Sequence, residues 1–218
     1  MINATGLRWI LTALFTFPAL YALWSTAAPG RTPANRVEHT LHAVMGFAMT
    51  AMAWPWGMDL PAGPQIVVFS AGGVWFAAAA LARASRANTR TAALVAALPH
   101  IVMMGAMAWM ATVMNGSGMA AGAGGAGHDM PGMDMAGTNA TSAMTLSRAG
   151  DQWTACLLAV ALVILGLRWL AQAFDHGRVA VTPATPRGTT ALLHSEASEP
   201  ACHAAMAVGM GVMLVLLV

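Results

Sequence analysis

The sequence predicts an all-α polytopic integral membrane protein, with six transmembrane helices arranged as three helix pairs and a flexible Met/His-rich outer loop. Only 8% of its 218 residues are charged, whereas 58% are hydrophobic. A soluble domain carries about 25% charged residues, and a disordered chain is much less apolar. Both of those classes are therefore excluded. The apolar runs are each close to the length of about 20 residues that an α-helix needs to cross the hydrocarbon core.

We expect one transmembrane domain over residues 1–218, in which the long segment 115–151 is a flexible extracytoplasmic loop rich in Gly, Ala and Met. The first apolar run has an alternative interpretation, because small residues at 25–28 resemble a signal-peptide cleavage site. We expect a helix there. The predicted membrane helices are residues 6–25, 39–58, 65–83, 91–114, 152–174 and 200–218.

The distribution of arginine predicts the orientation. All ten basic residues are Arg, and cytoplasmic loops are enriched in positive charge. The first, third and fifth connections carry most of them, so we expect a multi-pass protein of the cell membrane with both termini extracytoplasmic. No basic patch with interleaved aromatic residues is present, so nucleic acid is not an expected partner. The arginines that support this orientation are Arg31, Arg36, Arg83, Arg86, Arg90, Arg178 and Arg187.

One motif, H-x2-M-x3-M-x2-M, occurs three times, on the second, fourth and sixth predicted helices. At 100° per residue, its four side chains fall within an arc of roughly 80° and span roughly 15 Å along each helix. The predicted orientation makes the three helices parallel, so equivalent positions lie at similar depth. The copies are His42, Met45, Met49 and Met52; His100, Met103, Met107 and Met110; and His203, Met206, Met210 and Met213.

If these helices face one another, their side chains form three methionine layers above one histidine layer. Thioethers are soft ligands suited to Cu(I), and imidazole binds copper as well. We therefore predict a Cu(I) site built from the twelve motif residues. A histidine within a membrane span is costly and usually faces the bundle interior or a cavity.

Two further groups of residues extend the predicted copper path. The outer loop places His128, Met130, Met133 and Met135 within eight residues, where they would collect copper from outside, although a polar spacer is the alternative interpretation. Cys202 directly precedes His203, and its thiolate would accept Cu(I) at the inner end. Its alternative interpretation is a small buried residue. In the same inner region, Glu38 and His39 are interpreted as interface residues.

Two other functions are weighed against copper binding. Haem would use His and Met as axial ligands, and a structural membrane subunit would use its methionines only for packing. We do not expect an enzyme, because no Ser/His/Asp arrangement stands out and no P-loop is present. The spans also lack a central carboxylate, which disfavours proton relays and Na⁺ sites.

Two resemblances accompany these residues. The layout and the closing segment from His203 to Gly211 resemble an actinobacterial family of polytopic membrane proteins of unknown function (DUF5134-like), which implies no activity. The design is also similar to Ctr-type copper transporters, which have Met-rich outer segments, methionine triads and a His/Cys exit motif. This sequence departs from them by having six predicted spans and a longer motif, so that similarity concerns ligand chemistry alone.

The expected function is therefore a copper(I)-binding membrane protein that transports copper or stores and delivers it. The expected partners are copper ions and the lipid bilayer. A storage or delivery role would add a cuproenzyme or a copper chaperone.

Overall fold

The computed structural model describes residues 5–84, 87–123, 146, 148–180 and 197–218, and every regular element in this part of the chain is helical. The prediction of an all-α fold is confirmed. In chain order the elements are α1 Thr5–Ala27, α2 Pro33–Met52, the short 3-10 helix η1 Pro55–Asp59, α3 Ala62–Arg83, α4 Ala87–Ala123, α5 Ala149–Ala180 and α7 Ser198–Val215.

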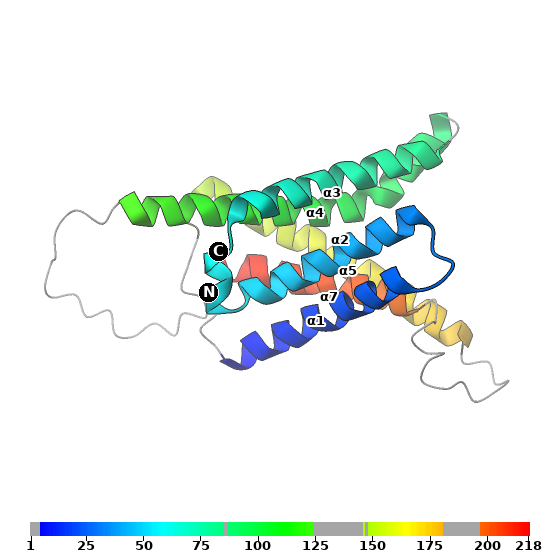
Figure 1. Cartoon of the computed structure of the whole chain (residues 1–218), viewed down its shortest axis with the longest axis horizontal. Helices are drawn as coiled ribbons and strands as arrows, with labels where there is room; N and C mark the ends of the chain where they lie inside the picture. Colours follow the sequence, from blue (N-terminus) through cyan, green and yellow to red (C-terminus); the bar gives the residue numbers. More distant parts are fainter. Residues whose placement is uncertain (1–4, 85–86, 124–145, 147, 181–196) are drawn as a thin grey trace, which may run out of the picture.

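The long helices lie side by side and alternate in direction (Figure 1). Helices α2, α4 and α7 run in one sense, while α1, α3 and α5 run in the other. The most extensive backbone contacts join α1 to α2, α3 to α4 and α5 to α7, and α7 also contacts α1. The three helices that carry the repeated motif are consequently parallel, and each is packed against an antiparallel neighbour.

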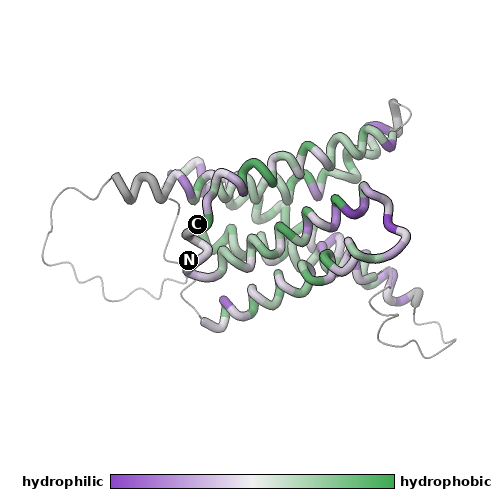
Figure 2. The backbone as a smooth tube through the Cα atoms, in the orientation of Figure 1, coloured by the Kyte–Doolittle hydropathy of each residue, from purple (hydrophilic) through white to green (hydrophobic). Residues whose placement is uncertain are grey.

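Five helices are long and apolar enough to cross a membrane by length and composition: α1, α3, α4, α5 and α7. Helix α2 does not reach that hydropathy, because its first turns carry polar residues such as Arg36, Glu38 and His42. The predicted count of six membrane helices is therefore not confirmed by hydropathy alone. Hydrophobic residues follow the middle of the helices in Figure 2, and hydrophilic residues gather toward their ends.

Helix α2 begins and ends at local signals that differ from the predicted bounds of 39–58. The hydroxyl of Thr32 accepts a hydrogen bond from the backbone N–H of Asn35 at 3.3 Å, and Pro33 occupies the first turn. Both features favour a helix start. The helix stops at Met52, before Pro55, which begins η1. The polar N-terminal turns thus belong to the helix, while the predicted last turn does not.

The predicted loop 115–151 is shorter in the structure. Helix α4 continues as far as Ala123, and α5 begins at Ala149. Residues 124–145 lie outside the described residues.

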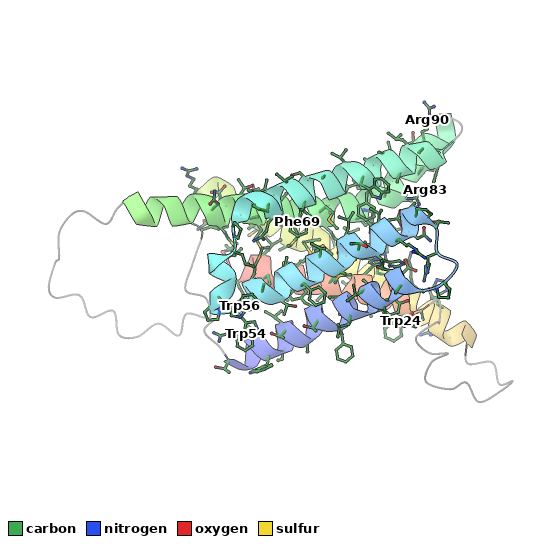
Figure 3. The ribbon with its side chains drawn as sticks, in the orientation of Figure 1. Trp24, Trp54, Trp56, Phe69, Arg83 and Arg90 are labelled. Carbon is green, nitrogen blue, oxygen red and sulfur yellow. The ribbon has the colours of Figure 1, made fainter. Side chains whose placement is uncertain are left out.

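The two ends of the bundle carry different aromatic groups (Figure 3). At one end, the indole N–H of Trp54 donates to the Thr12 hydroxyl at 3.0 Å, and the Arg8 guanidinium lies 5.4 Å from the centre of the Trp54 ring. At the other end lie Trp24 and Arg83. Tryptophan and arginine at helix ends are typical of the two faces of a membrane protein.

Glycine allows α2 to approach α1 closely. A Cβ atom at Gly46 would lie 2.8 Å from the Ala19 Cβ and 3.0 Å from the Phe15 carbonyl oxygen. The Phe15 carbonyl oxygen belongs to the backbone and cannot rotate away from such a Cβ atom. Small residues at such contacts are a common device for packing membrane helices.

We predict that Gly46→Ala destabilises the protein by about 1–3 kcal/mol, because the added methyl overpacks this contact. The measurement is the thermal unfolding midpoint in detergent. Gly105→Ala is the matched control, since a Cβ there meets no heavy atom within 4 Å. Alanine should be neutral or slightly stabilising at that position. Equal midpoints for the two variants would contradict the packing argument.

Candidate metal centre

Three histidines from three different helices converge at one level of the bundle. His42 lies on α2, His100 on α4 and His203 on α7. The ring centroid of His42 is 4.5 Å from that of His203 and 5.2 Å from that of His100, and the His100–His203 distance is 5.0 Å. One ring nitrogen from each histidine lies within 4.8 Å of the other two. We call these three residues the histidine cluster.

The hydrogen bond of His42 indicates which of its ring nitrogens carries the proton. Its Nδ1 lies 2.7 Å from the backbone carbonyl oxygen of Glu38. A carbonyl only accepts, so Nδ1 carries the proton and Nε2 keeps its lone pair. Metal-bound histidines commonly use this arrangement, in which a backbone carbonyl orients the ring.

The Nε2 atom of His42 is buried and has no hydrogen-bond partner among the described residues. The whole side chain is only 3% exposed. A buried acceptor without a partner costs about 1–3 kcal/mol. A cation bound at Nε2 would remove that cost, and this makes the histidine cluster a candidate metal site.

The spacing of the cluster suits a small metal ion. Metal–nitrogen bonds of about 2.0–2.1 Å place the nitrogens of three ligands about 3.3–3.6 Å apart in trigonal or tetrahedral geometry. Because the ring nitrogens lie at most 4.8 Å apart, the rings would have to close by no more than about 1.5 Å to hold such an ion.

Aromatic side chains enclose the cluster on two sides. Phe76 of α3 stacks on His100 with ring centroids 5.0 Å apart. Trp169 of α5 lies 5.2 Å from His203 and 5.4 Å from His100 by the same measure. These rings restrict how the imidazoles turn and keep the cluster away from lipid.

A pocket of about 290 Å³ leads from the cluster to the end of the bundle that carries Arg83. The side chain of Arg83 forms an ion pair with Glu38 beside this pocket. The lining residues come from the start of α2, the end of α5 and the start of α7, in addition to the three histidines: Glu38, His39, Trp169, Gln172, His176, Glu199 and Pro200.

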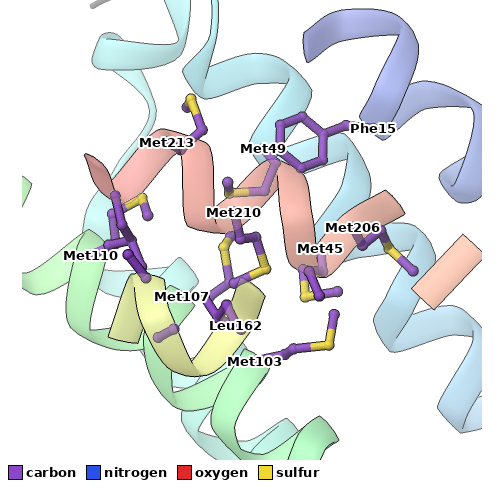
Figure 4. Packing of buried hydrophobic residues seen from close by; sticks show 14 of the residues in the cluster. Phe15, Met45, Met49, Met103, Met107, Met110, Leu162, Met206, Met210 and Met213 are labelled. Atoms are coloured by element: carbon purple, nitrogen blue, oxygen red, sulfur yellow. The ribbon is translucent and has the colours of Figure 1, made fainter. Parts of the chain in front are cut away.

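The methionines of the repeated motif lie on the other side of the cluster and are at most 6% exposed. We call the nine of them the methionine core. In Figure 4, Met45, Met103 and Met206 lie toward one end, and Met110 and Met213 toward the other. Met49, Met107 and Met210 lie between them. The three stripes therefore point inward, in the order along the bundle that the motif implies, and Met52 belongs to the same core.

The structure places the remaining predicted ligands differently. Cys202 is half-buried on α7 but does not line the pocket. The predicted outer cluster of His128, Met130, Met133 and Met135 lies outside the described residues.

Several residues beside the cluster were not predicted as part of a site. His39, interpreted as an interface residue, is only 6% exposed and lines the pocket. His176 belongs to α5 and lines the same pocket. The sequence did contain a signal for His39: it precedes His42 by three residues, and residues with that spacing share one face of a helix. Trp169 had no comparable signal, because its partners come from other helices.

These features define an all-helical protein with several helices that are long and apolar enough to cross a membrane, and with a histidine cluster beside a buried methionine core. The chain belongs to the family described as a domain of unknown function, DUF5134, whose model matches residues 34–217. This bears out the family resemblance of the sequence.

Two mycobacterial proteins are similar to this chain. The uncharacterized protein Rv0970 of Mycobacterium tuberculosis and the uncharacterized protein Mb0995 of Mycobacterium bovis are each 38% identical to it over 115 residues. The alignment covers 53% of this chain and 53% of each relative, so the aligned part spans about half the length of these curated relatives. No solved structure matches the chain.

Proposed function

We propose that this protein binds copper(I) within the membrane, through the histidine cluster and the methionine core. The observation that carries the proposal is the convergence of three copies of one motif. One ring nitrogen of each histidine lies within 4.8 Å of the corresponding nitrogens of the other two, and the nine methionines are all buried. Ordinary packing requires buried apolar side chains, but it does not require a histidine at the same position of each copy.

The ligand types favour copper(I) over other ions. Three imidazoles alone suit zinc and copper equally, because imidazole is a ligand of intermediate softness. Thioethers discriminate between them, since they bind soft ions such as Cu(I) and have little affinity for hard ones. An ion that passes from the histidine cluster into the methionine core is therefore expected to be Cu(I).

The membrane arrangement that accompanies this function has six spans, with α2 as the sixth. Its polar residues lie around the pocket, whereas Val44 and Phe47 on its outer face are each 41% exposed. An apolar outer face with a polar inner face suits a helix that lies in lipid and lines a site. Under this arrangement both termini are extracytoplasmic, and the pocket opens toward the cytoplasm at the arginine-rich end.

Two uses of such a site follow from its layers. The layers are separated by three or four residues, or about 5 Å of helix rise, and several similar sites in a row suit conduction. The same layers would equally hold several ions for storage or for delivery to a cuproenzyme or a copper chaperone.

Haem fits the surroundings of the cluster less well. A porphyrin inserted between two of the imidazoles would have to displace the third histidine together with Phe76 and Trp169, whose rings lie about the cluster. The packing-only interpretation does not explain why the Nε2 atom of His42 is buried without a hydrogen-bond partner among the described residues.

The experiment that tests the proposal is a competition titration of the purified full-length protein with Cu(I). We expect more than one Cu(I) per chain, because the three methionine layers and the histidine cluster supply several sites. A stoichiometry below one ion per chain would refute copper binding. A Soret band in the visible spectrum would instead support haem.

To separate conduction from storage, radioactive copper uptake is measured in proteoliposomes. Uptake no faster than in empty vesicles would favour storage or delivery.

A further inference from the structure

The pocket beside the histidine cluster contains a second group of metal-ligating side chains that the repeated motif does not include. His39, His176 and Glu199 line it, and each comes from a different helix. We infer that this pocket is the port through which the ion enters and leaves the histidine cluster, and that these three side chains bind it first. The inference rests on the proposed copper function and identifies where exchange takes place.

Each of the three helices contributes a deep and a shallow residue to the pocket. On α2, His39 precedes His42 by three residues, and on α7, Glu199 precedes His203 by four. On α5, His176 follows Gln172 by four and Trp169 by seven. Residues with these spacings share one face of a helix. The shallow group therefore lies about one to two helical turns nearer the end of the bundle than the cluster does.

Exposure separates the outermost side chains from the rest. Glu199 and His176 are exposed, whereas His100 is half-buried, His39 is 6% exposed and His42 is 3% exposed. The ligands thus progress from solvent-accessible carboxylate and imidazole groups to half-buried and buried imidazoles, and then to the buried thioethers. An ion moving inward exchanges water for protein ligands in steps, so that at no point is it stripped of all its ligands.

The Nε2 atom of His42 provides an independent reason to expect a cation in the pocket. His42 lines the pocket, and its Nε2 atom is shielded from solvent and lacks a hydrogen-bond partner among the described residues. The methionine core on the far side of the cluster is almost completely buried. Within the described part of the chain, an ion released from the core toward the arginine-rich end must pass the cluster and then this pocket.

The first test fills the pocket with a larger side chain. Gln172→Trp adds bulk to its wall without removing a metal ligand, and Leu170→Trp places the same side chain on the outer face of α5, where Leu170 is 39% exposed. Each purified full-length protein is loaded with Cu(I) to equilibrium. The rate of copper transfer to the water-soluble chelator bathocuproine disulfonate is then followed in detergent.

We expect Gln172→Trp to slow the transfer at least about tenfold, which corresponds to about 1.4 kcal/mol in the barrier. Leu170→Trp should match the wild type. Transfer by Gln172→Trp within about twofold of the wild type would overturn the inference. A wild-type protein that takes up no Cu(I) refutes the proposed function itself, and this result differs visibly from unchanged exchange kinetics in a loaded protein.

A second variant keeps the inference testable if Gln172→Trp does not fold. Glu199→Gln combined with His176→Gln removes two shallow ligands and leaves the histidine cluster intact, while Asp175→Asn is an exposed neighbouring change that does not line the pocket. We expect the double variant to slow transfer about tenfold relative to Asp175→Asn. Equal or faster transfer would show that the shallow group takes no part in exchange.

Discussion

Replacing His42 with phenylalanine should lower the affinity of the histidine cluster for a metal ion by at least about 100-fold. Structural metal sites with four ligands contribute about 10–16 kcal/mol, or roughly 3 kcal/mol for each ligand. The same substitution removes the buried Nε2 atom that has no partner among the described residues. That atom costs about 1–3 kcal/mol in the metal-free protein, so the metal-free variant should be at least as stable as the wild type.

The measurement combines two readouts on the purified protein. Competition titration gives the affinity for Cu(I), and thermal unfolding of the metal-free form gives the stability. Leu170→Phe, at a position on the outer face of α5 that is 39% exposed, is the control and should change neither quantity. If His42→Phe destabilised the metal-free protein and left the affinity unaltered, His42 would be a packing residue and the cluster would not be a metal site.

Changing Met45, Met103 and Met206 together to leucine should lower the number of bound Cu(I) ions, because it removes all the thioethers of one layer, and should leave the protein folded. These three residues lie at the end of the methionine core nearest the histidine cluster, since each follows its histidine by three residues. Leucine fills a similar volume, and such exchanges usually cost less than about 1.5 kcal/mol each. It has no sulfur to bind copper. Zinc binding by the histidine cluster should remain, because it does not depend on thioethers.

A single-residue comparison on α4 sharpens this test. Met103 and Met104 are adjacent and both fully buried, but Met104 points away from the motif stripe, and its sulfur would lie 3.2 Å from a Cβ built at Gly72 of α3. Met103→Leu should reduce the copper stoichiometry, whereas Met104→Leu should not. Equal effects of the two substitutions would mean that methionine acts only as core filling.

The sequence was sufficient to predict the helical class and which face of three helices points inward. Both follow from local regularity, because apolar runs specify membrane helices and a repeated spacing specifies one helical face. Periodicity within a single segment is enough to predict that one face of a helix points inward. It therefore predicted the inward direction of His42, His100, His203 and the nine motif methionines. That these residues bind a metal remains a prediction.

The bounds of α2 were predicted less well, because a hydropathy pattern overlooks capping. Thr32 and Pro33 start the helix well before its apolar part, and the chain stops being α-helical at Met52, before Pro55. The extra N-terminal turns bring Glu38 and His39 into the helix and therefore beside the pocket. The sequence interpretation of these two as interface residues missed that role, since exposure depends on neighbours that local pattern does not reveal.

The sequence by itself determined that this protein is helical, apolar enough for a membrane, and equipped with three equivalent His/Met stripes. Only the tertiary structure decided that the three histidines meet, that Phe76 and Trp169 enclose them, and that a pocket joins them to one end of the bundle. The physical reason is that periodicity defines the face of one helix, whereas a site between helices depends on their relative rotation and axial position. Those are set by close contacts such as that of Gly46 with α1, which no single segment encodes.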